Sequence, residues 1–512
     1  MNSIKQNILI LSLILLSGSL SAKIVSRTVF NLPAPFRPSS VEELAAKRNQ
    51  LLYLDQDLQQ QLTVTPFGSL SVSSDGLSQY FLPGQTGSNR TDMVAGEFGS
   101  AAVMSGSADI IASYVGVLTA PLPTDADPFL SSNYKFQSKL TFAPKASVCG
   151  AAITYRHHLS DYIDKGFWIE IVAPIVRVKT SLGLREEIQV SGGPTGANPS
   201  VPAGKFGNMT SALRQSDWNY NKISGSQTKA GLADLYLKLG YIYAQEEHYY
   251  LNTYFGAVIP TSAKPTNEFL FEPTMGNNGH FGILSGASAG VRLWADCDKS
   301  LYWTIDTAGT MLLPTNHLRT MDLQGRPWSR YLWVNLNKTS DALNPGVNSF
   351  TLPVQVDVGT VRDLNTAWVY KINNFHLEAG YHLFHRGAEE LTLQHSLANG
   401  VAVAGIVDQS GNYNAGGGIS CNQASIKRYL TVNNDKDSAG NETYQSLTDA
   451  DLDLNSAAHP AMTVHGFYLS AGHHWLDFTT PVFLGAGTMF EWGGDNAALN
   501  RLGFWGKIEL SF

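Results

Sequence analysis

Residue types that serine hydrolases use lie together in the stretch 394–400, which reads QHSLANG. Within it His395 is directly next to Ser396, and Asn399 and Gly400 follow. Serine hydrolysis needs a nucleophile, a base within hydrogen-bonding reach and donors that stabilise an oxyanion. The stretch belongs to a long polar region, where a surface loop is the simpler interpretation. We therefore expect no catalytic residues.

Histidine pairs and cysteines are the next candidates for chemistry. The pairs are His157-His158 and His473-His474. Adjacent residues on a strand point to opposite faces, so neither pair can bind one ion from one side. The three cysteines are widely spaced and form no CxxC motif: Cys149, Cys297 and Cys421. We expect no metal site and no cofactor.

An acidic stretch offers a candidate calcium site. Asp435, Asp437 and Gly440 match the first, third and sixth positions of an EF-hand loop. The twelfth position, which requires glutamate, is Ser446. The motif therefore fails, and we expect a solvated surface loop. Further acids that could contribute oxygens follow in the chain: Asp449, Asp451 and Asp453.

Residues 1–22 have the pattern of a secretory signal peptide. Lys5 gives a positive start, residues 8–16 (ILILSLILL) are almost entirely apolar, and residues 17–22 (SGSLSA) supply small residues for cleavage. No later stretch reaches the ~18–20 apolar residues of a spanning helix. The sequence thus predicts an exported mature chain that is either soluble or a barrel.

The composition favours a β-rich, turn-rich protein. Charged residues make up 15% of the chain and the net charge is −7, which argues against nucleic-acid binding. Glycine is abundant (47), as are tyrosine (21), phenylalanine (23) and tryptophan (10).

Residues 23–133 predict an N-terminal segment of mixed structure. Ser40 and Glu43 fit a capping box, and leucines at helical spacing follow, so we expect a helix near 41–60. The helix is either an amphipathic surface helix or a segment packed in or near a barrel mouth, as a plug or hatch. Residues 62–73 suggest a strand of weaker pattern.

Residues 134–512 alternate apolar and polar side chains in segments of about ten residues. The last of them, 501–512 (RLGFWGKIELSF), has Leu502, Phe504, Ile508, Leu510 and Phe512 on one face. Such alternation is typical of strands with one apolar face. We count about fourteen segments, with a range of 12–16, and each is long enough to cross a bilayer when tilted. They include segments near 134–142, 327–337 and 349–361, of which the last two have a weaker pattern. A secreted soluble sandwich is the alternative.

The connections between these segments alternate in length. Short turns near 159–166, 245–247, 296–300, 373–374 and 476–479 fall on one side of the predicted sheet. Long loops near 181–230, 261–280 and 387–461 fall on the other side, and we expect these to be extracellular. Two connections break the pattern: a short one near Pro144 and a long one near 338–348.

Charged residues on the polar faces predict the lining of a lumen, because a lipid-facing Arg or Lys at the midplane would cost roughly 2–4 kcal/mol. The candidates are Lys135, Lys139, Arg156, Glu170, Asp234, Lys238, Arg292, Asp306, Lys371, Glu378, Arg501, Lys507 and Glu509. Because both signs occur, we expect a weakly selective filter.

The signal peptide, the serial amphipathic strands and the C-terminal Phe512 together resemble the porin-like β-barrels of the bacterial outer membrane. The resemblance implies an all-β transmembrane antiparallel barrel in a Gram-negative-type envelope. It also implies that Ile508, Leu510 and Phe512 form an assembly signal for the barrel-insertion machinery. A stretch with histidine near serine also resembles, faintly, the signature of outer-membrane phospholipases, but the spacing differs.

The function this resemblance implies is a non-enzymatic channel for passive diffusion of small polar solutes. Its partners would be outer-membrane lipid and those solutes, with homo-oligomerisation left open. One alternative is a structural or adhesive barrel without an open pore. Another is a barrel similar to fatty-acid transporters with an N-terminal hatch.

Overall fold

The computed structural model describes residues 24, 26–44, 60–73, 77–81, 92–95, 137–159, 166–190, 208–337, 343–404, 418–419 and 445–512. The predicted signal peptide, most of the predicted helix and the EF-hand-like stretch lie outside the described residues. Among the described helices, none has the length and apolarity needed to cross a membrane.

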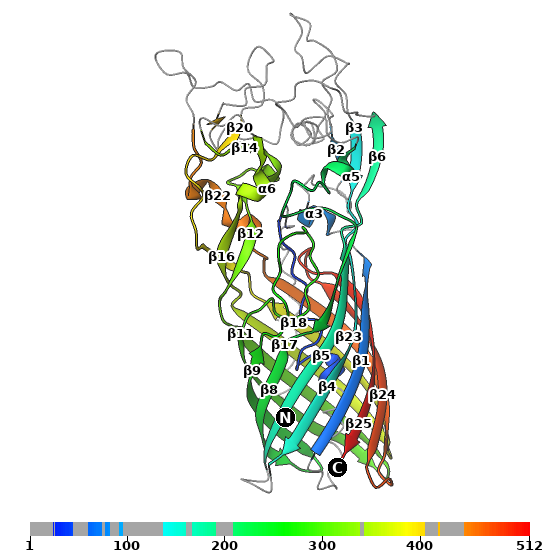
Figure 1. Ribbon diagram of the computed structural model, residues 1–512. Coiled ribbons are helices and arrows are strands. Elements are labelled where there is room, and N and C mark those ends of the chain that lie inside the picture. The colour runs from blue at the N-terminus through cyan, green and yellow to red at the C-terminus, as the bar shows by residue number, and fades with distance from the viewer. Residues whose placement is uncertain are drawn as a thin grey trace, which may run out of the picture.

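The protein is a closed antiparallel β-barrel (Figure 1). Among the described residues, thirteen strands share the sheet; the pairing described for β7 is with β5 alone, which leaves twelve strands in the ring. In chain order the ring strands are β1 (Gln60–Ser73), β4 (Lys145–His158), β5 (Phe167–Ser181), β8 (Leu235–Gln245), β9 (Tyr249–Ile259), β10 (Gly282–Asp296), β11 (Lys299–Leu312), β17 (Thr360–Ile372), β18 (Phe375–Arg386), β23 (Met462–Trp475), β24 (Val482–Gly493) and β25 (Asn500–Ser511). The predicted all-β closed barrel is confirmed; its described ring has twelve strands, the lower limit of the expected range of 12–16, and not the fourteen that were counted.

The first and last strands close the ring. β1 pairs with β25 on one side and with β4 on the other, and Gln60 and Phe512 exchange backbone hydrogen bonds of 2.8 and 2.9 Å. The barrel therefore includes residues that the sequence analysis assigned to the N-terminal segment before residue 134. Pro66 and Gly68 interrupt the apolar alternation of β1, which explains its weak sequence pattern.

Three expected barrel segments belong to small sheets above the barrel. The segment at 134–142 contains β3 (Gln137–Thr141), the segment at 327–337 contains β14 (Trp333–Asn335), and the segment at 349–361 contains β16 (Thr351–Asp357). Removing these three and adding β1 changes the count from fourteen to twelve. Period-two alternation does not distinguish a barrel wall from a small sheet, because both bury one face.

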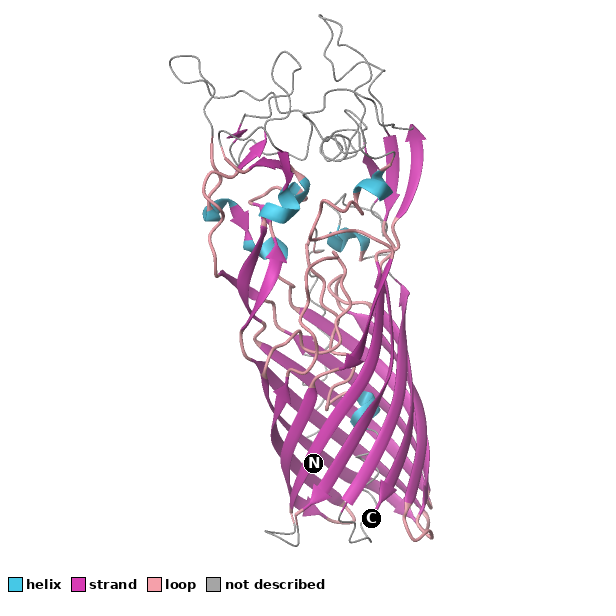
Figure 2. Cartoon of the chain, viewed as in Figure 1, coloured by secondary structure: helices cyan, strands magenta, loops and turns pink. Residues whose placement is uncertain are grey.

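The remaining elements form the head of the molecule above the barrel (Figure 2). Its sheets are β2 (Asp92–Ala95) with β3 and β6 (Arg185–Val190); β12 (Thr315–Thr320) with β16 and β19 (Glu390–Leu393); β13 (Asp322–Leu323) with β22 (Leu452–Asp453); and β14 with β15 (Leu343–Pro345), β20 (Ala402–Ala404) and β21 (Gly418–Ile419). Short helices are α3 (Ser78–Phe81), α5 (Met209–Ala212), α6 (Gly346–Ser349), η1 (Ser329–Tyr331), η2 (Asp449–Asp451) and η3 (Leu454–Ala457). β7 (Ser226–Leu232) extends the wall beside β5.

The two ends of the barrel differ. The connections after β4, β8, β10, β17 and β23 are short and lie at one end, called here the turn end, where β1 starts and β25 finishes. The long connections that form the head lie at the other, the loop end. Neither of the two connections that broke the expected pattern joins two barrel strands. The one near Pro144 joins β3 of the head to the ring strand β4, and the one near 338–348 lies between β14 and β16 of the head.

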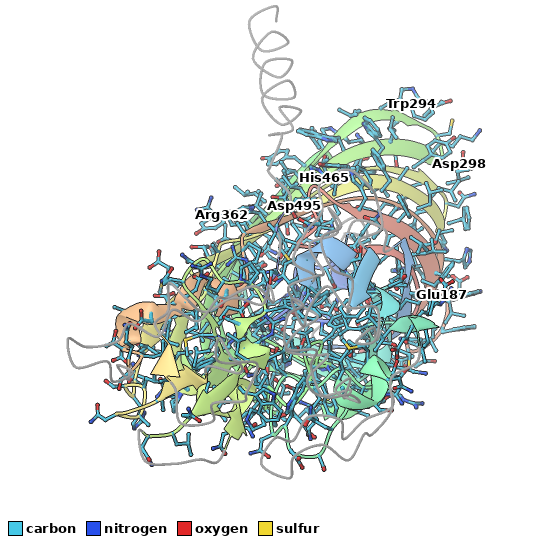
Figure 3. The ribbon with its side chains drawn as sticks, turned by 90° about the horizontal axis from the view of Figure 1, so that it is seen from above. Glu187, Trp294, Asp298, Arg362, His465 and Asp495 are labelled. Atoms are coloured by element: carbon cyan, nitrogen blue, oxygen red, sulfur yellow. The ribbon has the colours of Figure 1, made fainter. Side chains whose placement is uncertain are left out.

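The barrel is apolar outside and polar inside. Along β5 the outward-facing Ile171 is 44% exposed, whereas the inward-facing Glu170 is 1% exposed. The outward positions of the other strands carry exposed apolar side chains in the same way, among them Leu239, Trp368, Phe467 and Phe504. Viewed along the barrel, Trp294 projects away from the wall (Figure 3). This distribution is the reverse of a soluble barrel with an apolar core.

Candidate functional site: the filled lumen

A segment of the N-terminal region, residues 26–44, lies buried inside the barrel and is called here the lumen segment. At the loop end its backbone binds the head: Arg27 N donates to Tyr80 O at 2.7 Å and Thr28 N to Ser456 O at 2.9 Å. Residues 41–44 are helical and follow Ser40, whose carbonyl accepts from Glu43 N and Leu44 N. The predicted helix therefore begins where expected, and residues 45–59 lie outside the described part.

Glu389 fixes the upper part of the lumen segment. Its carboxylate accepts a 2.7 Å hydrogen bond from Asn31 Nδ2 and pairs with Arg386 at 2.8 Å and Arg319 at 3.2 Å. All four side chains are buried. Burial raises the pKa of Glu389, but the two arginines outweigh it and bring the pKa to about 2. Glu389 is therefore ionised at neutral pH.

Asp363 on β17 holds the middle of the lumen segment. Arg37 donates to Asp363 Oδ1 at 3.1 Å, and Ser39 Oγ donates to Oδ2 at 2.7 Å. Asn365, the next inward residue of the same strand, donates to Ser39 O at 3.0 Å. The Arg37 guanidinium also lies 4.4 Å from the ring centre of Phe384 on β18. One wall thus binds both charge and backbone of the segment.

The opposite walls bind the segment mainly through its carbonyl groups. Tyr236 OH donates to Phe36 O at 3.1 Å, and Lys507 Nζ donates to Glu43 O at 3.1 Å. Thr154 Oγ1 lies 3.2 Å from the Glu43 carboxylate. The bond to Phe36 O gives a partner to a carbonyl in the irregular part of the buried segment, as buried backbone requires, and the bond to Glu43 O reaches its helical part.

The charged wall residues form clusters of opposite sign across neighbouring strands. Arg156 on β4, Glu170 on β5 and Lys238 on β8 are in register, with N···O distances of 3.1 and 3.0 Å to Glu170. Lys238 Nζ also lies 3.4 Å from Pro38 O, and Arg156 stacks 4.0 Å over Trp168. Such pairing removes the cost of unpaired buried charges.

A second cluster lies beside Arg37. His382 is between Asp363 at 3.1 Å and Glu491 at 3.4 Å, and Glu491 accepts from Arg501 Nε at 2.9 Å. Arg37 and Glu42 of the lumen segment line a cavity of about 10 Å³ together with His382, Glu491 and Arg501 of this cluster. That volume is comparable with the space of one water molecule. The described lumen is therefore filled at this level.

The structure places most predicted lumen residues on inward faces of the ring. Buried there are Arg156, Glu170, Asp234, Lys238, Asp306, Glu378, Arg501, Lys507 and Glu509. Glu378 accepts from Tyr468 OH at 2.9 Å, and Glu509 from Thr63 Oγ1 at 3.2 Å. Asp234 lies where β7 gives way to β8 and accepts from Ser262 Oγ at 2.7 Å.

Arg292 and Lys371 share the inward register of β10 and β17 but lie at the turn end, where Arg292 pairs with Glu247 and Lys371 is half-buried opposite His376. The other two candidates lie elsewhere. Lys139 belongs to β3 in the head and not to the ring. Lys135 lies outside the described residues. The proposed assembly residues Ile508, Leu510 and Phe512 face outward on or just after β25 and are exposed.

Sequence reasoning did not identify Arg37, Asp363 and Glu389 as site residues. Asp363 alternates with the apolar residues of β17, so its inward position follows from the same period that identified the others. Arg37 and Glu389 lie in irregular segments where no period exists, and nothing in the sequence connects them to the lumen.

The motifs with possible chemistry have structural roles. His395 and Ser396 are exposed in the head, and His473 contacts Trp475 whereas His474 contacts the buried Phe483. Asp449, Asp451 and Asp453 accept hydrogen bonds from backbone amides of the head. Within the described ranges, no three His, Cys, Asp or Glu residues gather closely enough to hold a metal ion.

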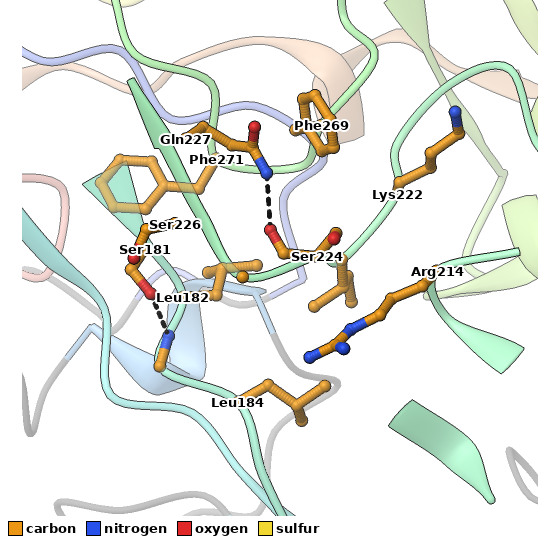
Figure 4. Close-up of a pocket in the computed structure, with 13 residues that line it drawn as sticks. Ser181, Leu182, Leu184, Arg214, Lys222, Ser224, Ser226, Gln227, Phe269 and Phe271 are labelled. Carbon is orange, nitrogen blue, oxygen red and sulfur yellow. Dashed lines mark hydrogen bonds between the residues drawn. The ribbon is translucent and has the colours of Figure 1, made fainter. Parts of the chain in front are cut away.

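A second cavity of about 120 Å³ opens in the head next to β5 and β7 (Figure 4). Arg214 points between Leu182 and Leu184 at its edge, whereas Lys222 points away and pairs with Glu268 at 3.2 Å. Its remaining lining is mostly small or apolar. Its lining includes Phe271, which packs against Phe30 of the lumen segment, but none of the side chains that hydrogen-bond or ion-pair with that segment.

Comparison with known proteins gives solved structures only, because no family model and no curated protein match the chain. An outer membrane channel from Pseudomonas putida F1 has 9% identity over 90% of this chain and 98% of its own, with a TM-score of 0.36. The β-domain of the Bordetella autotransporter BrkA has 8% identity over 89% and 100%, with a TM-score of 0.31. A Pseudomonas aeruginosa FadL homologue has 9% identity over 96% and 98%, with a TM-score of 0.28. With identities and TM-scores this low, the likenesses carry no argument about what the chain does.

Proposed function

We propose that the protein is an outer-membrane channel for small polar solutes whose lumen is filled by residues 26–44 in the closed state. The observation that carries this proposal is the polar inner wall, which binds the lumen segment through hydrogen bonds and ion pairs. Water and polar solutes can replace such contacts when the segment moves. In a dry apolar core, by contrast, buried charges would only add a desolvation cost.

The membrane location is supported by the outer face of the ring. Exposed apolar residues occupy its outward positions, and each of the twelve described ring strands pairs with a neighbour on both sides. Lipid-exposed backbone must be fully hydrogen-bonded, which a closed barrel achieves. The turn end would lie in the periplasm and the head outside the cell. Insertion by the barrel-assembly machinery through Ile508, Leu510 and Phe512 is part of this proposal.

Planar-bilayer conductance of the purified protein tests the function. Deleting residues 26–58 removes the lumen segment but keeps β1, so the ring can still close. We expect low or flickering conductance for the full chain and a larger, stable conductance for the deletion. Equal conductance of the two proteins would reject the lumen segment as the obstruction, and no channel events from either would reject the channel.

An apolar cargo is the second candidate. Phe30 of the lumen segment packs with Tyr80, Phe81 and Phe271 at the loop end, with ring centres 4.9, 6.0 and 5.4 Å apart. Such a cluster suits an apolar ligand better than a sugar or ion. Uptake into vesicles of a polar and an apolar solute of similar size separates the two: faster entry of the apolar solute alone would favour a hatch-type transporter.

A further inference from the structure

Three basic residues lie close together on the outer face of the barrel wall. Lys145 on β4 and Arg177 and Lys179 on β5 are exposed, while their sequence neighbours Ala146, Val176 and Val178 are buried. The three side chains therefore face outward. In the loop-end halves of the described ring strands, no Asp or Glu faces outward. The three residues are called here the basic patch.

The register places the three cations close together. Lys179 lies opposite Ser147 and Lys145 opposite Ser181, so the two lysines are diagonal neighbours. Diagonal neighbours on one face of an antiparallel pair are roughly 7–8 Å apart, and Arg177 is two residues from Lys179 on the same strand, roughly 7 Å away. All three can contact one ligand that carries more than one negative charge.

The basic patch directly continues the apolar outer face. The next outward residue of β5 toward the turn end is Ile175, 53% exposed, and Ile171 at 44% follows after Ala173. On β4 the outward residues Ser147, Cys149 and Ala151 separate Lys145 from Ile153, which is 43% exposed. A ligand that contacts both regions has an anionic head and apolar chains. The first exposed acid in the opposite direction is Glu187, six residues beyond Ser181 on β6, roughly 20 Å along the chain.

We propose that the basic patch binds the phosphate groups of a phosphorylated glycolipid of the outer leaflet, whose acyl chains lie against Ile175, Ile171 and Ile153. This inference rests on the proposed location in the outer membrane but not on conduction. The loop-end position selects the outer leaflet, where such glycolipids are the anionic lipids. Arg177 can bind a phosphate through two parallel N–H···O bonds, and the two lysines add point charges.

The test is native mass spectrometry of the purified full chain in neutral detergent, titrated with bisphosphorylated lipid A, dephosphorylated lipid A or phosphatidylglycerol. The variant is Lys145→Gln/Arg177→Gln/Lys179→Gln. The matched control is Arg214→Gln/Lys264→Gln/Lys299→Gln, which removes three exposed cations outside the patch. Heat-modifiable migration on a detergent gel verifies that each variant is folded. We expect both to fold, because the substituted side chains are exposed.

We expect the wild type and the control to bind bisphosphorylated lipid A equally. The patch variant should bind it about a hundredfold more weakly, because each cation near an anionic lipid surface contributes about fivefold. Equal losses in variant and control, equal binding of dephosphorylated lipid A, or equal binding of phosphatidylglycerol would each overturn the proposal. A protein without conductance that still binds lipid A through the patch would refute the channel and leave this inference standing.

Discussion

At the scale of single residues, the buried ionic contacts decide whether the lumen segment stays in place. Asp363 and Glu389 each bind a side chain of the segment and one or more basic groups. Removing one partner of a buried pair costs roughly 3–5 kcal/mol, because the other charge remains unpaired. These two carboxylates are therefore where substitutions should have the largest effects on closure.

Asp363→Asn is expected to increase the open probability of the channel. The neutral amide keeps the size of the side chain but leaves Arg37 without its counter-charge, which favours movement of the segment into water. Single-channel recording of the variant against the wild type measures the effect. Asp296→Asn, at an exposed position of the β10–β11 turn, is the control and should conduct like the wild type.

Glu389 is expected to make stability depend on pH in acid. Its folded-state pKa of about 2 is below the ordinary value of 4.5, so its contribution is complete above pH 4.5 and is lost as the pH falls toward 2. The contribution corresponds to about 3 kcal/mol, as an order of magnitude. Urea unfolding between pH 6 and pH 3 should show this decline in the wild type.

Glu389→Gln should be less stable at pH 6 and should show a smaller decline between pH 4.5 and pH 3. His317 and His459 also make the folded protein less stable in acid. Burial lowers the pKa of each histidine to about 3, so below about pH 6.5 these two side chains take up protons in the unfolded chain but not in the folded one. Their effect begins at higher pH and persists in the variant. Parallel curves for the two proteins below pH 4.5 would contradict the role of Glu389.

At the scale of elements, β1 determines whether the ring can close. It supplies the partner edges for both β25 and β4. Deleting residues 60–73 should leave two unpaired edges and abolish heat-modifiable migration on a detergent gel, whereas deleting residues 26–58 should preserve it. A closed eleven-stranded barrel in the first variant would show that β25 and β4 can pair directly.

The sequence reveals a strand only where polar and apolar side chains alternate in step with its inward and outward faces. β5, β8 and β25 were located within a few residues because their inward and outward faces differ in polarity along the whole strand. β1 was underestimated because Pro66 and Gly68 weaken that contrast. β3, β14 and β16 were misplaced because a small sheet in the head has the same period. A ring strand and a head strand differ in which strands they pair with. These partners are distant in sequence, and a single sequence does not reveal them.

At the scale of the whole molecule, the outer face sets the limits of substitution. Leu239 lies outward on β8 and is 49% exposed. Leu239→Lys is expected to destabilise the protein in lipid vesicles by roughly 2–4 kcal/mol if the residue faces the bilayer core. Thr228→Lys, outward on β7 at the loop end, should cost less than about 1 kcal/mol. Urea unfolding from vesicles measures both, and equal effects would contradict the proposed orientation in the membrane.

The path of the lumen segment has a consequence for the order of folding. The segment enters at the loop end and passes down the barrel, and the chain then reaches β1 at the turn end. The seam between β1 and β25 joins the first and the last ring strand in chain order, so it forms after the other ring strands have been synthesised. If the lumen segment already lies against the curved sheet, it is enclosed when β1 pairs with β25. If the segment is still outside at that point, it has to pass through a closed ring. Nucleation of the barrel around its own N-terminal segment is therefore the more accessible route.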